Sequence, residues 1–291
     1  MSALRQATPP VALVTAVALP PGRRRKRVPI VLALGLLLVL GWVVVAVFWP
    51  QLAPQDPQLQ HPAHRLAAPG GANLLGTDQF GRDTFSRVLA GARPVLRIAP
   101  VATLLAVVAG TAIGLLAGTY GRWVDGVIMR VLDAVLVFPS IIASVLFVAL
   151  LGHSATVLVL VIGISFVPIV ARSVRAATLV ERAKPYVDAA RLRGEPGWSL
   201  MLREILPNVA RTVLVEATSR LGDAVFAVAT LAFLGLGQEP GSPDWGTSVS
   251  DNRAWLPTAP WTVLAPALAI ASLVVGVALV ADDLRARFEA A

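Results

Sequence analysis

The sequence contains no cysteine, only three histidines and very little lysine. Without cysteine, the chain has no disulfide framework, no thiolate metal site and no cysteine nucleophile, and its redox compartment stays open. A phosphate-binding loop requires a Gly-Lys pair followed by serine or threonine. The two lysines do not fit, because Lys26 follows Arg25 and Lys184 follows Ala183. The chain is therefore not expected to hydrolyse ATP by itself.

Other candidates for catalysis or metal binding are equally sparse. His61 and His64 flank Pro62 but have no third ligand nearby, which does not favour a metal site. Ser165 lacks the Gly-x-Ser-x-Gly frame and a histidine partner of a hydrolase nucleophile. His153 lies in a short turn and is better explained as a cap or an interface residue. No catalytic residue, cofactor site or metal site is predicted on this chain.

Charge is also scarce, whereas apolar residues are abundant. Charged residues make up 14% of the 291 positions and hydrophobic residues 56%, which is typical of a polytopic membrane protein. The net charge of +8 could suggest nucleic-acid binding. Its distribution fits membrane topology better, so no nucleic-acid partner is expected.

Apolar runs predict an all-α fold with six membrane-spanning helices. Five uncharged runs are long enough to cross about 30 Å of hydrocarbon: 29–50, 98–121, 134–152, 154–171 and 262–281. A sixth run, 209–236, is interrupted by Glu216, Arg220 and Asp223, and we expect it to span the membrane with a charged cytosolic half. The lipid bilayer is therefore the first predicted partner.

Basic residues predict the orientation. With a cytosolic N-terminus, eighteen of them fall in cytosolic segments and five in outer loops, which favours two cytosolic termini. The resulting segments are a cytosolic tail (1–28), a first membrane anchor (29–50), an outer loop with an amphipathic helix (51–97), a core of five spans (98–281) and a cytosolic tail (282–291).

The amphipathic helix is predicted within residues 74–94. Phe80, Thr84 and Val88 would share one face, opposite Arg82 and Arg87. We expect this helix to lie on the outer surface. It is either a packed loop or a docking or gating element.

Proline and glycine predict breaks and kinks elsewhere. Pro139 and Pro168 lie inside predicted spans, where neighbouring helices can cover a kink. Residues 151–154 predict a very short hairpin between the third and fourth spans. Residues 233–246 end the fifth span and hold Trp245, which we expect to be an interfacial aromatic anchor. A packed loop and a docking or gating role remain equal alternatives for this segment.

The charged group of the fifth span forms a stripe. Glu216 and Arg220 are four residues apart and Asp223 is three further on, so the three share one helical face and can pair in sequence. Such residues rarely face lipid. The stripe either lines the cytosolic mouth of a pathway or forms a neutralised seam between helices, and we favour the seam.

The least apolar long stretch is 186–208. Pro185 suits the first turn of a helix, and Asp188 lies where its charge suits the helix dipole. Ala189 and Ala190 would leave a smooth exposed surface, and Gly194 allows a sharp turn. A second short helix then leads back into the membrane. The pattern predicts a cytosolic helix-turn-helix between the fourth and fifth spans.

This stretch resembles the coupling loop, or EAA loop, of ABC importer permeases. The resemblance is carried by Asp188-Ala189-Ala190, by Gly194, and by Ile205-Leu206-Pro207. Segments 74–87, 121–140 and 231–246 further resemble the dipeptide and oligopeptide (and nickel) subfamily, in particular its C-type permease. The sequence departs from that pattern at Asp188, where glutamate is usual, at Glu204, where histidine is frequent, and at Val228, where an acidic residue is common.

The resemblance implies a type I ABC importer permease fold in a bacterial plasma membrane. It implies a second permease, two ATP-binding cassette subunits or one fused double ATPase, and an extracytoplasmic substrate-binding protein. ATP and Mg would bind the ATPase subunits, which would contact the loop through Tyr186, Asp188, Ala189, Ala190, Gly194, Ile205, Leu206 and Pro207. An ion-coupled secondary transporter is the alternative, although such folds more often show paired symmetric halves.

Overall fold

The computed structural model describes residues 29–238 and 241–290, and the regular structure in these ranges is helical. The predicted tail 1–28, with its basic cluster, lies outside the described residues. The long helices are α1 (Pro29–Leu52), α2 (Thr84–Tyr120), α5 (Ala155–Arg182), α8 (Leu206–Leu231) and α10 (Trp261–Ala290).

The shorter helices are α3 (Arg122–Val137), α4 (Ser140–Leu151), α6 (Pro185–Leu192), α7 (Gly197–Ser199) and α9 (Trp245–Asn252). Two 3-10 turns (Pro62–His64 and Arg253–Trp255) and two π-helical turns (Leu200–Ile205 and Ala232–Leu236) complete the described structure. Five helices are long and apolar enough to cross a membrane, and α3 with α4 would make a sixth span if the bent pair counts as one. The predicted all-α membrane fold is confirmed.

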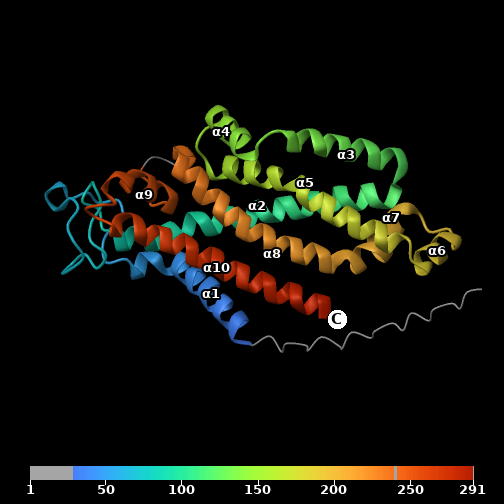
Figure 1. Cartoon of the computed structure of the whole chain (residues 1–291), viewed down its shortest axis with the longest axis horizontal. Helices are drawn as coiled ribbons and strands as arrows, with labels where there is room; N and C mark the ends of the chain where they lie inside the picture. The colour runs from blue at the N-terminus through green and yellow to red at the C-terminus, as the bar shows by residue number, and fades with distance from the viewer. Residues whose placement is uncertain (1–28, 239–240, 291) are drawn as a thin grey trace, which may run out of the picture.

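The long helices form an elongated bundle (Figure 1). Helices α6 and α7 lie at one end of the bundle, which we call the α6 end. The segment between α1 and α2 lies with α9 at the opposite end, the α9 end. The first residue of α1 and the last residues of α10 point toward the α6 end. Segment 186–208, the start of α1 and the end of α10 are therefore on the same side of the bundle.

Helices α2 and α5 approach closely because α2 carries glycine at every fourth position. A Cβ atom at Gly110 would lie 2.6 Å from the Val170 Cβ, and one at Gly114 would lie 2.6 Å from the Ala171 carbonyl oxygen. At Gly118 the nearest atom would be the Thr178 Cγ2, at 2.5 Å. Small residues in this spacing let helix backbones pack tightly where lipid supplies no hydrophobic driving force.

The third predicted span is not one straight helix. Helix α3 begins at Arg122, and the chain breaks at Phe138 and Pro139 before α4, with an 80° bend. Phe138 adopts an extended conformation because the proline ring excludes the helical one from the residue before it. The predicted hairpin is confirmed, since α4 ends at Leu151 and the Ser154 hydroxyl caps α5 by accepting from the Val157 N–H.

The predicted surface helix of 74–94 is wrong. The helix begins only at Thr84, where the Asp83 carboxylate accepts from the Ser86 N–H at 2.8 Å, and it continues without a break as α2. Arg82 and Arg87 are buried, because the Asp78 carboxylate pairs with both at 2.6 and 3.8 Å. Periodicity places these arginines on one face but does not reveal that carboxylates and carbonyls cover that face.

Trp245 is also not an interfacial anchor. Its side chain is fully buried, and its indole N–H donates to the Val88 carbonyl oxygen at 2.7 Å. Its ring meets Trp42 of α1 edge to face, with centroids 4.8 Å apart. Trp245 therefore fastens α9 to α1 and α2 inside the bundle.

Candidate functional site

The segment between α5 and α8 forms the predicted helix-turn-helix. Pro185 lies in the first turn of α6, and Asp188 is exposed and pairs with Arg191 at 3.2 Å. Gly194 has φ of +79°, a left-handed conformation that favours glycine. Arg193 stabilises the turn, because its guanidinium contacts the Glu195 carboxylate at 2.6 Å and the Glu204 carboxylate at 3.6 Å.

The two neighbouring alanines of α6 lie on different faces of the helix. Ala189 is exposed, as predicted, whereas Ala190 is fully buried with Val187 and Ile205. These side chains pack against Val170 and Val174 of α5. The prediction that Ala190 belongs to the exposed surface is therefore wrong, because the helix turns this position toward the bundle.

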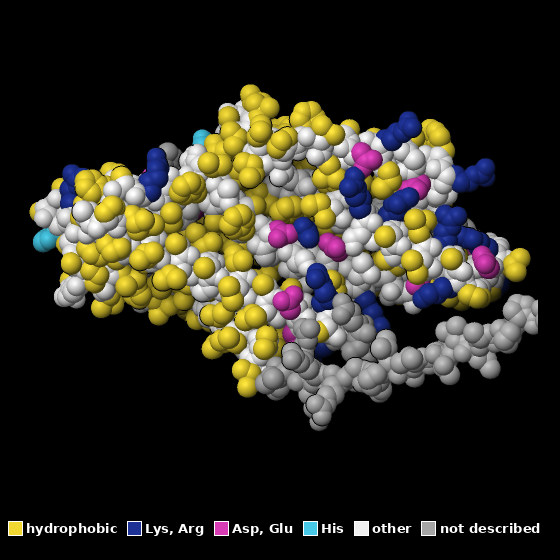
Figure 2. Space-filling model, in the orientation of Figure 1, with side chains coloured by type: hydrophobic (Ala, Val, Ile, Leu, Met, Phe, Trp, Pro, Cys, Tyr) yellow, Lys and Arg dark blue, Asp and Glu magenta, His cyan; other side chains and the backbone are white. Residues whose placement is uncertain are grey.

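The exposed side of the segment combines apolar tips with basic residues. Leu192 is 90% exposed and Trp198 54% exposed. Arg191, Arg193 and Arg203 are exposed beside them. Figure 2 shows Lys and Arg side chains gathered at this end of the molecule. Such a protrusion suits a groove on another protein that combines apolar surface with acidic groups.

Tyr186 joins three elements at the base of the protrusion. Its hydroxyl donates to the Glu181 carboxylate of α5 at 2.9 Å and accepts from the Asn208 amide of α8 at 3.1 Å. Partial burial, and then the hydrogen bond to Glu181 and its charge, raise the pKa of Tyr186 to about 12. The hydroxyl therefore stays protonated and keeps its donor role at physiological pH.

The end of the segment continues directly into α8. Ile205 is buried at the end of a π-helical turn, Leu206 is partly buried, and Pro207 lies in the first turn of α8. Single π-helical turns frequently occur at functional sites. A displacement of the protrusion would thus act on α8 along a nearly continuous helical path.

The predicted pairing of the charged stripe is confirmed. The Arg220 guanidinium contacts the Glu216 carboxylate at 3.5 Å and the Asp223 carboxylate at 2.6 Å, and it lies over the Phe166 ring of α5 at 5.9 Å. Charged side chains are visible over α8 in an otherwise largely apolar face (Figure 2). The side chains of Glu216 and Arg220 are mostly covered, whereas that of Asp223 is 50% exposed. Arg220 therefore packs against α5 as well as against its two carboxylate partners on α8, whereas Asp223 reaches the exposed surface.

Asp223 lines a cavity of about 220 Å³ between α4, α5 and α8. Besides Asp223, the wall contains four side chains with a hydroxyl group, which are Ser140, Ser144, Ser165 and Thr230. The remaining side chains are aliphatic or aromatic: Ile141, Ile162, Phe166, Phe226, Ala227 and Leu231. A second hollow, of about 500 Å³, lies on the other side of Phe226 and Thr230, against α9 and α10. One face of α8 is therefore flanked by open space on both sides.

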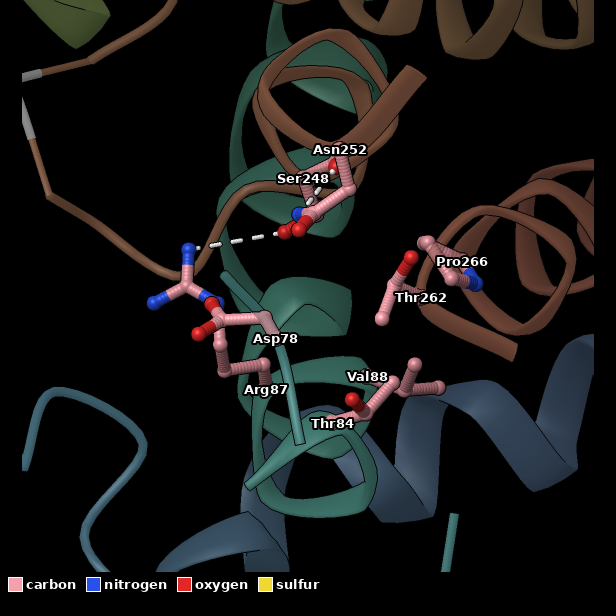
Figure 3. A pocket seen from close by; sticks show the side chains of 8 residues that line it. All are labelled: Asp78, Thr84, Arg87, Val88, Ser248, Asn252, Thr262 and Pro266. Carbon is pink, nitrogen blue, oxygen red and sulfur yellow. Dashed lines mark hydrogen bonds and ion pairs between the residues drawn. The ribbon is translucent and has the colours of Figure 1, made fainter. Parts of the chain in front are cut away.

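A buried polar network at the α9 end escaped the sequence reasoning. The Arg87 guanidinium donates to the Ser242 carbonyl oxygen at 3.2 Å and to the Ser248 hydroxyl at 3.4 Å. Figure 3 shows Asp78 and Arg87 directed toward α9, with Thr262 of α10 nearby. In the sequence, this network is marked only by charged residues that flank two loops. A charged residue beside a loop can be either buried or solvated, so the pattern does not reveal the network.

Asp244 connects this network to the start of α9. Its carboxylate caps the helix by accepting from the Gly246 N–H at 2.9 Å. Burial raises the pKa of Asp244 to about 6, against the opposing effects of the Gly246 and Thr247 N–H groups and of Arg87. His153, the predicted cap or interface residue, has its Nδ1 atom 3.4 Å from the Gly237 carbonyl oxygen. The His153 contact links the turn between α4 and α5 to the segment before α9.

Comparisons with known proteins agree on one family. Residues 110–290 match the family described as binding-protein-dependent transport system inner membrane component. The dipeptide transport system permease protein DppC of Alkalihalophilus pseudofirmus is 38% identical over 86% of this chain and 83% of its own. The glutathione transport system permease protein GsiD of Pectobacterium atrosepticum is 36% identical over 90% and 87%. The di/tripeptide transport system permease protein DppC of Pseudomonas aeruginosa is 38% identical over 86% and 85%.

Proposed function

Because the chain belongs to the family of binding-protein-dependent transport system inner membrane components, we propose that it is a permease subunit of an ATP-driven importer of dipeptides or oligopeptides. The observation that carries the proposal is the exposed helix-turn-helix of 186–207, which leads directly into α8. ATP would be hydrolysed by partner subunits that bind ATP and Mg. This chain would supply half of the membrane pathway.

The proposed partners follow from the same segment. Two ATP-binding cassette subunits, or one fused double ATPase, would hold the protrusion in a groove. A second homologous permease would complete the pathway, and an extracytoplasmic substrate-binding protein would deliver the peptide. Tyr186 contacts both Glu181 of α5 and Asn208 of α8, so a movement of α6 would reach two long helices at once.

We place the protein in a bacterial inner membrane with both termini in the cytosol. Two observations support this orientation. Basic residues are concentrated in the segments that would face the cytosol. The α6 end, where ATPases would bind, is also the end toward which the described ends of α1 and α10 point.

Ala189→Glu tests the proposed ATPase contact. Ala189 is exposed on α6, so the added carboxylate leaves the packing of this chain intact but obstructs a close contact with a partner. We expect normal membrane insertion and at least tenfold less ATPase co-purification and peptide uptake in vesicles. Ala63→Glu is the control for ATPase binding, because Ala63 is an exposed alanine of the 3-10 turn at the α9 end, and it should leave ATPase co-purification unchanged.

Gly194→Val probes the turn by a different route. No atom of the structure lies within 4 Å of a Cβ at this position, so the cost arises from the backbone at φ of +79°. This strain is about 1–2 kcal/mol. The change should weaken ATPase association without affecting insertion. Full peptide uptake and normal ATPase co-purification in both variants would show that 186–208 is only a solvated connection.

A further inference from the structure

The cavity between α4, α5 and α8 has a chemistry that selects for a cation. We propose that this cavity receives the protonated amino terminus of the transported peptide and that the Asp223 carboxylate binds it. The inference rests on the proposed import function and adds to it a specific recognition site. Asp223 suits the role because it lines the cavity and its side chain is half exposed.

Three of the four hydroxyl groups of the cavity are available as acceptors and not as donors. The Ser144 hydroxyl donates to the Ser140 carbonyl oxygen at 2.7 Å, and the Ser165 hydroxyl donates to the Val161 carbonyl oxygen at 2.7 Å. The Thr230 hydroxyl donates to the Phe226 carbonyl oxygen at 2.9 Å. A hydroxyl has one proton and two lone pairs, so each of these groups presents only lone pairs to a ligand. An ammonium group, with three donors and no acceptor, complements them.

The charges near the cavity lead to the same conclusion. The stripe of Glu216, Arg220 and Asp223 carries two carboxylates and one guanidinium, which leaves one negative charge. None of the described residues that line the cavity is basic, and the nearby Arg220 lies over Phe166 and is held by both carboxylates. Arg220 contacts one oxygen of Asp223, and a carboxylate offers about four acceptor sites in all. Asp223 can therefore bind a second cationic donor.

The apolar part of the wall suits the rest of a peptide. Phe166 and Phe226 provide aromatic surface, and Ile141 and Ile162 provide aliphatic surface. Aromatic faces also attract ammonium groups. A lipid tail would fit this wall poorly, because it would leave the Asp223 carboxylate oxygen that Arg220 does not contact without a hydrogen-bond donor at membrane depth.

Asp223→Asn tests the proposal in the complete complex with its delivery protein. The substitution removes the charge but keeps the shape, and Glu216 remains to neutralise Arg220. We expect uptake of a free-amine dipeptide per ATP hydrolysed to fall about tenfold or more, as for loss of a charge-assisted hydrogen bond. Asp223→Glu should restore most of the uptake. Asp133→Asn, which removes an exposed carboxylate paired with Arg172 outside the cavity, should retain it within about twofold.

A chemical probe of the unaltered protein covers the case in which the variant fails to assemble. Carbodiimide treatment of the dipeptide-loaded complex should couple the amino nitrogen of an isotope-labelled dipeptide to Asp223, located by mass spectrometry. Coupling of Asp223 to a lysine of a partner subunit, or its recovery unlabelled, would overturn the proposal. Wild-type uptake in Asp223→Asn would do the same. Absence of ATP-dependent peptide uptake by the wild-type complex would instead overturn the proposed import function.

Discussion

At the scale of single residues, Asp244 is the clearest source of pH dependence outside the membrane-spanning helices. Its pKa is raised from 3.8 to about 6, so between these values the folded chain binds more protons than the unfolded chain. The contribution of Asp244 to stability is therefore full below pH 3.8 and is lost as the pH rises to about 6, by about 2–3 kcal/mol in all.

Asp244→Asn should remove most of this pH dependence. The amide oxygen can still accept from the Gly246 N–H, but the buried charge is gone. Thermal unfolding of the purified protein in detergent should give a clearly higher midpoint than wild type at pH 7, and the difference should be about a third as large at pH 4.5. Asp244→Ala also removes the charge but lacks the cap, so it should be about 1 kcal/mol less stable than Asp244→Asn at both pH values. An unchanged pH profile in Asp244→Asn would exclude Asp244 as its source.

Ala189 and Ala190 show where reasoning from single residues ends. Both were predicted to form one exposed surface, but adjacent helical positions point about 100° apart. The structure places Ala190 in the interior with Val187 and Ile205. The sequence identifies segment 186–208 as a candidate contact site. The rotation of α6 about its own axis, set by its packing against α5, decides which of the two alanines a partner can reach.

At the scale of elements, the glycines of α2 set the distance between α2 and α5. Gly114→Leu would place a side chain where the Ala171 carbonyl oxygen and Val174 now lie, and we expect a loss of about 2–3 kcal/mol or more from overpacking. The measurement is the thermal midpoint in detergent, with membrane yield as a second readout.

Gly126→Leu is the matched control for this substitution. A Cβ at Gly126 of α3 meets no atom within 4 Å, and leucine is a better helix former than glycine. The control should be at least as stable as wild type. Equal midpoints for the two variants would show that the close approach of α2 and α5 does not depend on glycine.

At the scale of the whole molecule, the predicted topology places the two ends of the bundle on opposite sides of the membrane. A reporter fused after Arg287 should be cytosolic, and one inserted near Gln58 should be outside. The C-terminal end of α10 points toward the α6 end of the bundle, whereas the 53–83 segment lies at the α9 end, which supports this expectation. A cytosolic signal from the Gln58 reporter would contradict the six-span orientation.

The sequence by itself determined the properties that depend on composition and local pattern. These are the all-α membrane fold, the hairpin at 151–154, the turn at Gly194 and the pairing of Glu216, Arg220 and Asp223. Each follows from hydropathy, from the conformational freedom of glycine, or from the three- and four-residue spacing of a helix.

Only the tertiary structure decided what each face meets. The 80° break at Pro139, the burial of Arg87 and Trp245, and the cavity beside Asp223 arise from contacts between segments far apart in the chain. A local pattern specifies which side chains share a face. The free energy of burying that face depends on the carboxylates, carbonyl oxygens and rings that another helix brings to it, and these partners are defined only once the bundle is packed.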